Sequence, residues 1–139
     1  MARGVRVSAG VAYDLGYHVV WCPRHRRPVL AGRVGERCGE LITQKCAGRE
    51  WRVVACEVVP GHVRLPVKAH PREAPSFIAS QLKGFTSRRL RDEFPHLRAR
   101  LPALWSRSYF TASVGAVGAA VRRYIGTLYE RPWRKERDR

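Results

Sequence analysis

Two apolar, β-branched runs joined by a proline–glycine turn constrain the fold of this chain more than any other feature. The turn lies in the segment Glu57-Val-Val-Pro-Gly-His-Val-Arg-Leu65. The flanking runs, Trp51–Val59 and His62–Ala69, have the composition of strands, and Pro60-Gly61 is a strong turn signal. The sequence therefore predicts a β-hairpin in the middle of the chain, and with it an antiparallel sheet.

The remaining segments alternate between strand and helix patterns. Tyr13–Cys22 is aromatic and β-branched with apolar residues at every second position, which predicts a first strand. From about residue 32 to 48 the apolar positions fall at helical spacing, and Ser76 is a candidate N-cap for a helix that reaches about Phe94. The segments that follow are predicted to be a basic connection over 95–102, a strand over 109–114 and a last helix over 116–129.

The predicted order is β-α-β-β-α-β-α, and its first six elements are those of a ferredoxin-like sandwich. We therefore expect an α+β fold, with an antiparallel sheet of about four strands, helices on one face and an additional C-terminal helix. The domain is expected to span residues 11–130. Residues 1–10 and the basic tail 131–139 are expected to be flexible ends.

The charge of the chain points to a polyanionic partner. Lysine and arginine together number 27 against 11 acidic residues, which gives a formal net charge of +16. A folded domain this basic repels itself unless it binds a polyanion, and the arginine side chain suits phosphate because its fork reaches two oxygens at once. The composition therefore predicts nucleic-acid binding. Arginine dominates, since the lysines are only Lys45, Lys68, Lys83 and Lys135.

The sequence gives little support to a membrane, secreted or zinc-binding protein. No apolar run approaches the roughly 20 residues of a membrane span, and polar and glycine residues interrupt the apolar stretch that a signal peptide would need. We therefore expect a cytoplasmic protein. Its cysteines contain no C-x-x-C pair, so they are predicted to be buried thiols in a reducing compartment. They are Cys22, Cys38, Cys46 and Cys56.

Five segments, in order, resemble one family over about residues 12–129. They match its first strand and basic turn, its metal-binding strand, its second helix, its fourth strand and its catalytic helix. The family is that of the one-tyrosine HUH transposases of small IS200-like insertion sequences. The five segments are Asp14–Arg27, Glu57–Leu65, Gln81–Leu90, Leu104–Gly115 and Val121–Ile125.

The resemblance implies a homodimeric enzyme that cuts single-stranded DNA, often beside a hairpin. A tyrosine hydroxyl attacks the phosphodiester and becomes a 5′-phosphotyrosine, and a divalent ion, Mg²⁺ or Mn²⁺, binds the phosphate. Two histidines at i and i+2 on the strand point to one face and hold the ion, and a polar ligand follows the tyrosine by one helical turn. By this mapping Tyr124 is the nucleophile and His62 the first metal ligand.

Three positions depart from the family pattern. Arg64 stands in place of the second histidine, Leu128 in place of the polar ligand, and Gly61 in place of a frequent aspartate. Arginine has no lone pair to give and stays charged, and leucine donates nothing. The replacements at Arg64 and Leu128 therefore disfavour metal binding and favour a protein that binds DNA without cutting it.

Basic side chains along the matching segments are predicted DNA contacts: Arg24, Arg26, Arg27, Arg64, Lys83, Arg88, Arg89, Arg122 and Arg123. A solvated helix face would account equally well for the basic residues of the second helix. Tyr124 also fits the stripe of a packed core face.

Three interpretations remain open from the sequence. The chain is a transposase that cuts single-stranded DNA, a relative that grips hairpin DNA without cutting, or a basic RNA-binding protein. The last interpretation explains the charge but not the five ordered segments.

Overall fold

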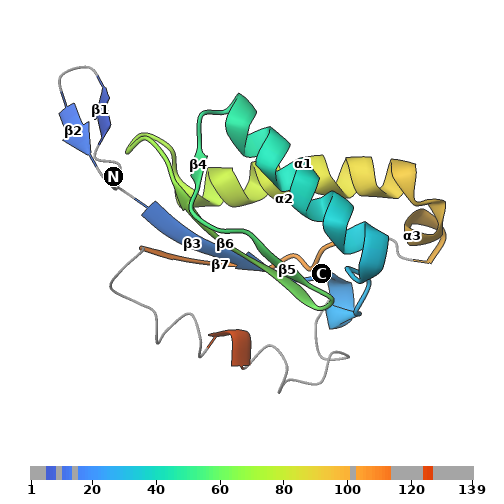
Figure 1. Cartoon of the computed structure of the whole chain (residues 1–139). Coiled ribbons are helices and arrows are strands. Elements are labelled where there is room, and N and C mark those ends of the chain that lie inside the picture. Colours follow the sequence, from blue (N-terminus) through green and yellow to red (C-terminus); the bar gives the residue numbers. More distant parts are fainter. Residues whose placement is uncertain (1–5, 9–10, 14–15, 101–102, 114–123, 127–139) are drawn as a thin grey trace.

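The two longest strands form the centre of an antiparallel sheet whose order is β4-β6-β3-β7, with β5 also paired to β6 (Figure 1). The computed structural model describes residues 6–8, 11–13, 16–100, 103–113 and 124–126. The strands of this sheet are β3 (Gly16–Trp21), β4 (Arg52–Val53), β5 (Glu57–Val59), β6 (His62–Lys68) and β7 (Phe110–Ser113).

Both long helices cover one face of this sheet (Figure 1). They are α1 (Gly32–Gly48) and α2 (Pro75–Glu93). Every second residue of the central strands points toward them, so strand and helix side chains form one buried core. This arrangement confirms the predicted α+β class with helices on one face. Core residues include Val19, Trp21, Val63, Leu65, Cys38, Leu41, Ile42, Ile78 and Leu82.

The predicted hairpin forms, but the prediction of one continuous strand over 51–59 was wrong. Val53 lies opposite Val67 in one part of the pairing, and Glu57 lies opposite Arg64 in the other. The three residues 54–56 therefore lie opposite only two residues, Leu65 and Pro66. The one extra residue makes this a β-bulge. Pro66 has no N–H to give to the ladder, although its carbonyl oxygen accepts a 2.9 Å hydrogen bond from the Val54 backbone N–H.

Other boundaries also differ from the sequence predictions. A short helix, α3 (Pro95–Arg100), occupies the predicted connection because it buries Leu97 against the core. Ser76 is not the N-cap of α2, since Ala74 holds that position and Pro75 begins the helix.

At the N-terminal end, β1 (Arg6–Ser8) and β2 (Val11–Tyr13) pair as a hairpin, where the sequence analysis expected no strand before Tyr13. At the C-terminal end, residues 124–126 are helical, as predicted. The rest of the predicted last helix and the tail 131–139 lie outside the described residues.

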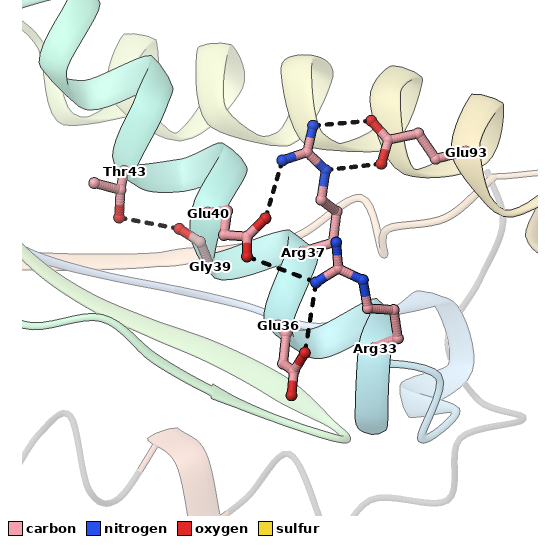
Figure 2. Close-up of polar contacts among 7 residues, drawn as sticks. All are labelled: Arg33, Glu36, Arg37, Gly39, Glu40, Thr43 and Glu93. Atoms are coloured by element: carbon pink, nitrogen blue, oxygen red, sulfur yellow. Dashed lines mark hydrogen bonds and ion pairs between the residues drawn. The ribbon is translucent and has the colours of Figure 1, made fainter.

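An arginine on α1 joins the two long helices on their solvent side (Figure 2). Arg37 donates to Glu93 of α2 through Nε at 2.7 Å and through a terminal nitrogen at 3.0 Å. It also donates to Glu40 at 3.0 Å. These hydrogen bonds raise the pKa of Arg37, and the bond from Arg37 lowers the pKa of Glu93. The paired charges fix the end of α2 against α1.

The structure describes all four cysteines and joins none of them in a disulfide. Three are buried, as predicted, and Cys56 is half-buried in the bulge. None of the helices in the described part of the chain combines the length and apolarity that crossing a membrane requires.

Candidate functional site

The predicted site residues of β6, His62 and Arg64, lie on the face of the sheet opposite α1 and α2. Val63 is fully buried in the core beneath the helices, so its neighbours His62 and Arg64 point to the other face. Val63, the residue between them, is therefore turned into the core. His62 is 8% exposed, and the Arg64 side chain is 33% exposed.

The strand register places Arg64 in a row of four residues across this face. Arg64 lies opposite Glu57 on one side and opposite Val20 on the other, and Val20 lies opposite Phe110. Residues directly opposite one another on paired strands share a face. The row therefore runs from a carboxylate through a guanidinium and a buried valine to an aromatic ring.

Arg64 and Glu57 form a direct ion pair within this row. Arg64 Nε donates a hydrogen bond to Glu57 Oε1 at 2.7 Å. Glu57 was not predicted as a partner of Arg64. The sequence does contain a signal for this pair. Residues 57 and 64 are equally far from the Pro60-Gly61 turn, so they face each other in the hairpin.

Tyr124 lies over the other end of the row. Its ring stacks on Phe110, with centroids 4.7 Å apart and planes 18° apart. It packs, together with Ile125, against buried Val20 and Cys22. Residues 124–126, red in Figure 1, lie on the side of the sheet away from α1 and α2. One chain thus brings the predicted nucleophile to the face that carries His62 and Arg64, and two strand spacings, about 10 Å, separate Phe110 from Arg64.

Two imidazoles on this face are held toward the neutral form. Burial lowers the pKa of His62, and Arg64 lowers it further while Glu57 acts in the opposite direction. His18 lies on β3 two residues before Val20, on the same face. Burial lowers the pKa of His18, and the positive charge of Arg64 adds to the effect. His18 comes to this face through the strand register, in which it lies opposite Pro66 of β6 and Ala112 of β7.

The described residues do not fit the divalent-ion site that the resemblance implies. Among them, no group of three or more His, Cys, Asp or Glu side chains is arranged to hold a metal ion. At the second ligand position, a guanidinium is already bonded to the Glu57 carboxylate. Leu128, at the third position, lies outside the described residues.

The predicted DNA-binding residues divide between the two faces of the molecule. Arg24 and Arg26 belong to a short 3₁₀ turn, η1 (Arg24–Arg26), that follows β3 at the end next to His62. Arg24 and Arg26 are half-buried and Arg27 is exposed. Arg122 and Arg123 lie outside the described residues.

The three predicted contacts on α2 lie on the helical face, away from Tyr124. Lys83 Nζ donates to the carbonyl oxygens of residues 106, 107 and 108 at 2.8, 3.2 and 3.4 Å. The geometry therefore gives Lys83 the task of holding the loop before β7. Arg89 lies over the Phe85 ring at 5.3 Å, and Arg88 is exposed.

Comparison with known proteins identifies the family. Residues 11–127 match the family model described as "Transposase IS200 like". The chain belongs to this transposase family. It is 32% identical over 131 residues to the ISDra2 transposase TnpA of Deinococcus radiodurans, covering 91% of this chain and 93% of the relative. It is also 26% identical over 119 residues to the transposase for insertion sequence element IS200 of Salmonella typhimurium, covering 84% and 78% of the two chains.

Solved structures agree with this assignment. A crystal structure of a transposase from Deinococcus radiodurans R1 superposes with a TM-score of 0.81 at 29% identity, covering 88% of this chain and 97% of that one. A REP-associated tyrosine transposase bound to a REP hairpin shares the fold, with a TM-score of 0.50 at 16% identity, covering 93% and 71%. The resemblance predicted from the five segments is confirmed at the level of the family.

Proposed function

We propose that this protein binds single-stranded DNA that folds into a hairpin, and that it holds the DNA on the sheet face of Tyr124, Arg64 and His62. Membership of the transposase family supports a DNA substrate. The net charge of +16 supports a polyanionic ligand. A transposase that shares this fold has been solved bound to a REP hairpin, which supports hairpin DNA as the ligand. As in the family, we propose that the protein acts as a homodimer in the cytoplasm, where its substrate would be.

The ion pair between Arg64 and Glu57 is the observation that favours binding over efficient cutting. A cation at the second ligand position repels a divalent ion, and the carboxylate beside it is engaged at 2.7 Å. Loss of outer-sphere groups alone costs about 10–100-fold in metal affinity or activity. We propose that strand cleavage is the weaker activity of this chain.

Retained cleavage is the second candidate, and the position of Tyr124 supports it. The tyrosine hydroxyl would attack the phosphorus, the bond from phosphorus to the 3′ oxygen would break, and a 3′-hydroxyl would leave. The product would be a 5′-phosphotyrosine on Tyr124. This reaction needs a phenol activated from its ordinary pKa of about 10, and the metal that would normally assist is disfavoured here.

A denaturing-gel assay separates these candidates. The protein is incubated with a fluorescent single-stranded hairpin and Mn²⁺ or Mg²⁺, while binding is followed by anisotropy in the same samples. We expect tight binding without a covalent adduct. An adduct that disappears in Tyr124→Phe would establish cleavage instead. If Arg64→His with Leu128→Gln restores the adduct, the replaced ligands are the cause of weak cutting. Absence of hairpin binding would refute the proposed function.

A further inference from the structure

We infer that Arg64, oriented by Glu57, is a phosphate-binding group in place of the family's metal site, so that this protein holds a DNA phosphate without a divalent ion. The inference rests on the proposed function for its DNA partner. Its structural basis is that the residues on the sheet face opposite α1 and α2 do not match the ligands of the ion that the family pattern implies.

The geometry of the pair leaves Arg64 able to bind a phosphate. Its contact with Glu57 uses Nε, and the two terminal amino groups of a guanidinium carry further N–H donors in a planar fork. That fork matches two phosphate oxygens. The side chain is 33% exposed. Arg64 therefore has both the donors and the access that a backbone phosphate needs.

Glu57 has two effects on this site. Its hydrogen bond at 2.7 Å holds the guanidinium in one orientation, which lowers the entropy lost when a phosphate binds. Its negative charge also repels the phosphate. Because glutamine keeps the accepting oxygen and removes the charge, Glu57→Gln should keep the orientation and strengthen binding.

The remainder of the row suits a nucleotide next to that phosphate. Val20 is buried between Arg64 and Phe110, and the stacked rings of Phe110 and Tyr124 lie beyond it. Single-stranded nucleic acids are commonly held by a cation at the backbone and aromatic rings at the bases. Arg64 and Phe110 lie on the two strands that flank Val20, so the cation and the aromatic rings share one surface.

Two measurements test the inference. The first is Mn²⁺ binding to the DNA-free protein, followed by electron paramagnetic resonance. We expect no Mn²⁺ site in the wild-type protein and a measurable one in Arg64→His, because that change removes the cation and adds an imidazole two residues from His62. Wild-type protein that binds Mn²⁺ as tightly as Arg64→His would overturn the inference.

The second measurement is DNA binding by anisotropy, with excess EDTA or with Mg²⁺. We expect wild-type affinity to be the same in both within about twofold, Arg64→Ala to be about tenfold weaker, and Glu57→Gln to be about fivefold tighter. Arg33→Ala is the matched control, since Arg33 forms an exposed ion pair with Glu36 on α1 at 3.5 Å. Arg64→Lys, which keeps the charge without the fork, guards against a folding defect in the alanine variant.

An unstructured oligothymidylate separates failure of this inference from failure of the proposed function. If the protein lacks a preference for hairpins but its binding to oligothymidylate depends on Arg64, the proposed function fails and the inference stands. If hairpins bind tightly and Arg64→Ala behaves like Arg33→Ala, the inference fails, while the proposed binding of hairpin DNA stands.

Discussion

The ring of Tyr124 lies parallel to that of Phe110, 4.7 Å away between centroids, so the first residue of β7 fixes the position of the predicted nucleophile. The loop before β7 is in turn fixed to α2 from the other side of the sheet. Lys83 bonds to three of its carbonyl oxygens, and Trp105 Nε1 donates to Thr86 Oγ1 at 3.0 Å. The loop before β7 is therefore anchored on the helical face, while the first residue of β7 contacts Tyr124 on the other face.

Replacing Phe110 by alanine should loosen Tyr124 and destabilise the fold. The change removes an aromatic stack worth about 0.5–1.5 kcal/mol beyond its buried area. Urea unfolding should show a loss of about 2 kcal/mol. Val54→Ala is the control, because Val54 is 55% exposed in the bulge. Equal stability of the two variants would contradict the stacked arrangement.

Lys83→Met should weaken stability more than DNA binding. The ammonium group donates to the carbonyl oxygens of residues 106–108, and losing such charged hydrogen bonds costs about 1.5–3 kcal/mol. We expect a lower urea midpoint with hairpin affinity changed no more than by Arg88→Ala, which removes an exposed cation from the same helix. A large loss of affinity at unchanged stability would make Lys83 a DNA contact instead.

Two glycines in the long helices should respond to alanine in opposite directions. A Cβ atom at Gly35 would lie 2.3 Å from the backbone carbonyl oxygen of Leu30, so the start of α1 would have to move. A Cβ atom at Gly84 meets open space within α2. We expect Gly35→Ala to lower the melting temperature and Gly84→Ala to stabilise by up to about 1 kcal/mol, the helix-propensity difference.

Stability should fall as the pH drops below about 6.5, the ordinary pKa of histidine. Burial lowers the pKa of both His62 and His18 in the folded protein, so the unfolded chain binds more protons in this range. This proton linkage lowers the free energy of unfolding as the pH falls from about 6.5 through the lowered pKa values of the two histidines. Thermal melts between about pH 5 and 8 should show this decline, and His62→Gln with His18→Gln should flatten it. An unchanged slope in the double variant would assign the decline to other groups.

Cys56 should react first with a thiol reagent under native conditions. Burial raises the pKa of Cys38 and of Cys46 to about 12, which suppresses the reactive thiolate. Burial also raises the pKa of Cys56, but this side chain is half-buried at the bulge. Mass mapping after limited reaction with Ellman's reagent checks the order, and Cys56→Ser should remove the fastest phase.

Local sequence patterns predicted those parts of the fold that depend on short-range periodicity. The helices over 32–48 and 76–94 and the Pro60-Gly61 hairpin were visible because apolar spacing and turn residues encode them directly. The bulge was not predicted, since it depends on how the residues between β4 and β5 lie opposite Leu65 and Pro66 across the hairpin. Helix α3 was missed because a short basic segment shows no periodicity, and only packing of Leu97 reveals it.

The site was predicted as a set of residues but not as an arrangement. Tyr124, His62 and Arg64 were named from the family pattern, and the structure brings them to one face. The roles of Phe110, His18 and Glu57 follow from cross-strand register, which joins positions far apart in sequence. Register depends on the whole sheet, so a reading of separate segments cannot supply it.

The bulge between β4 and β5 has a consequence for self-association. An exposed edge strand can pair with a strand of another molecule when it offers a long, regular series of unpaired backbone N–H and C=O groups. Here the edge beside β6 consists of two short strands, β4 with two residues and β5 with three. Their pairing registers against β6 differ by one residue. Another chain that pairs in register with one piece is one residue out of register with the other, so this irregularity disfavours strand addition at this edge.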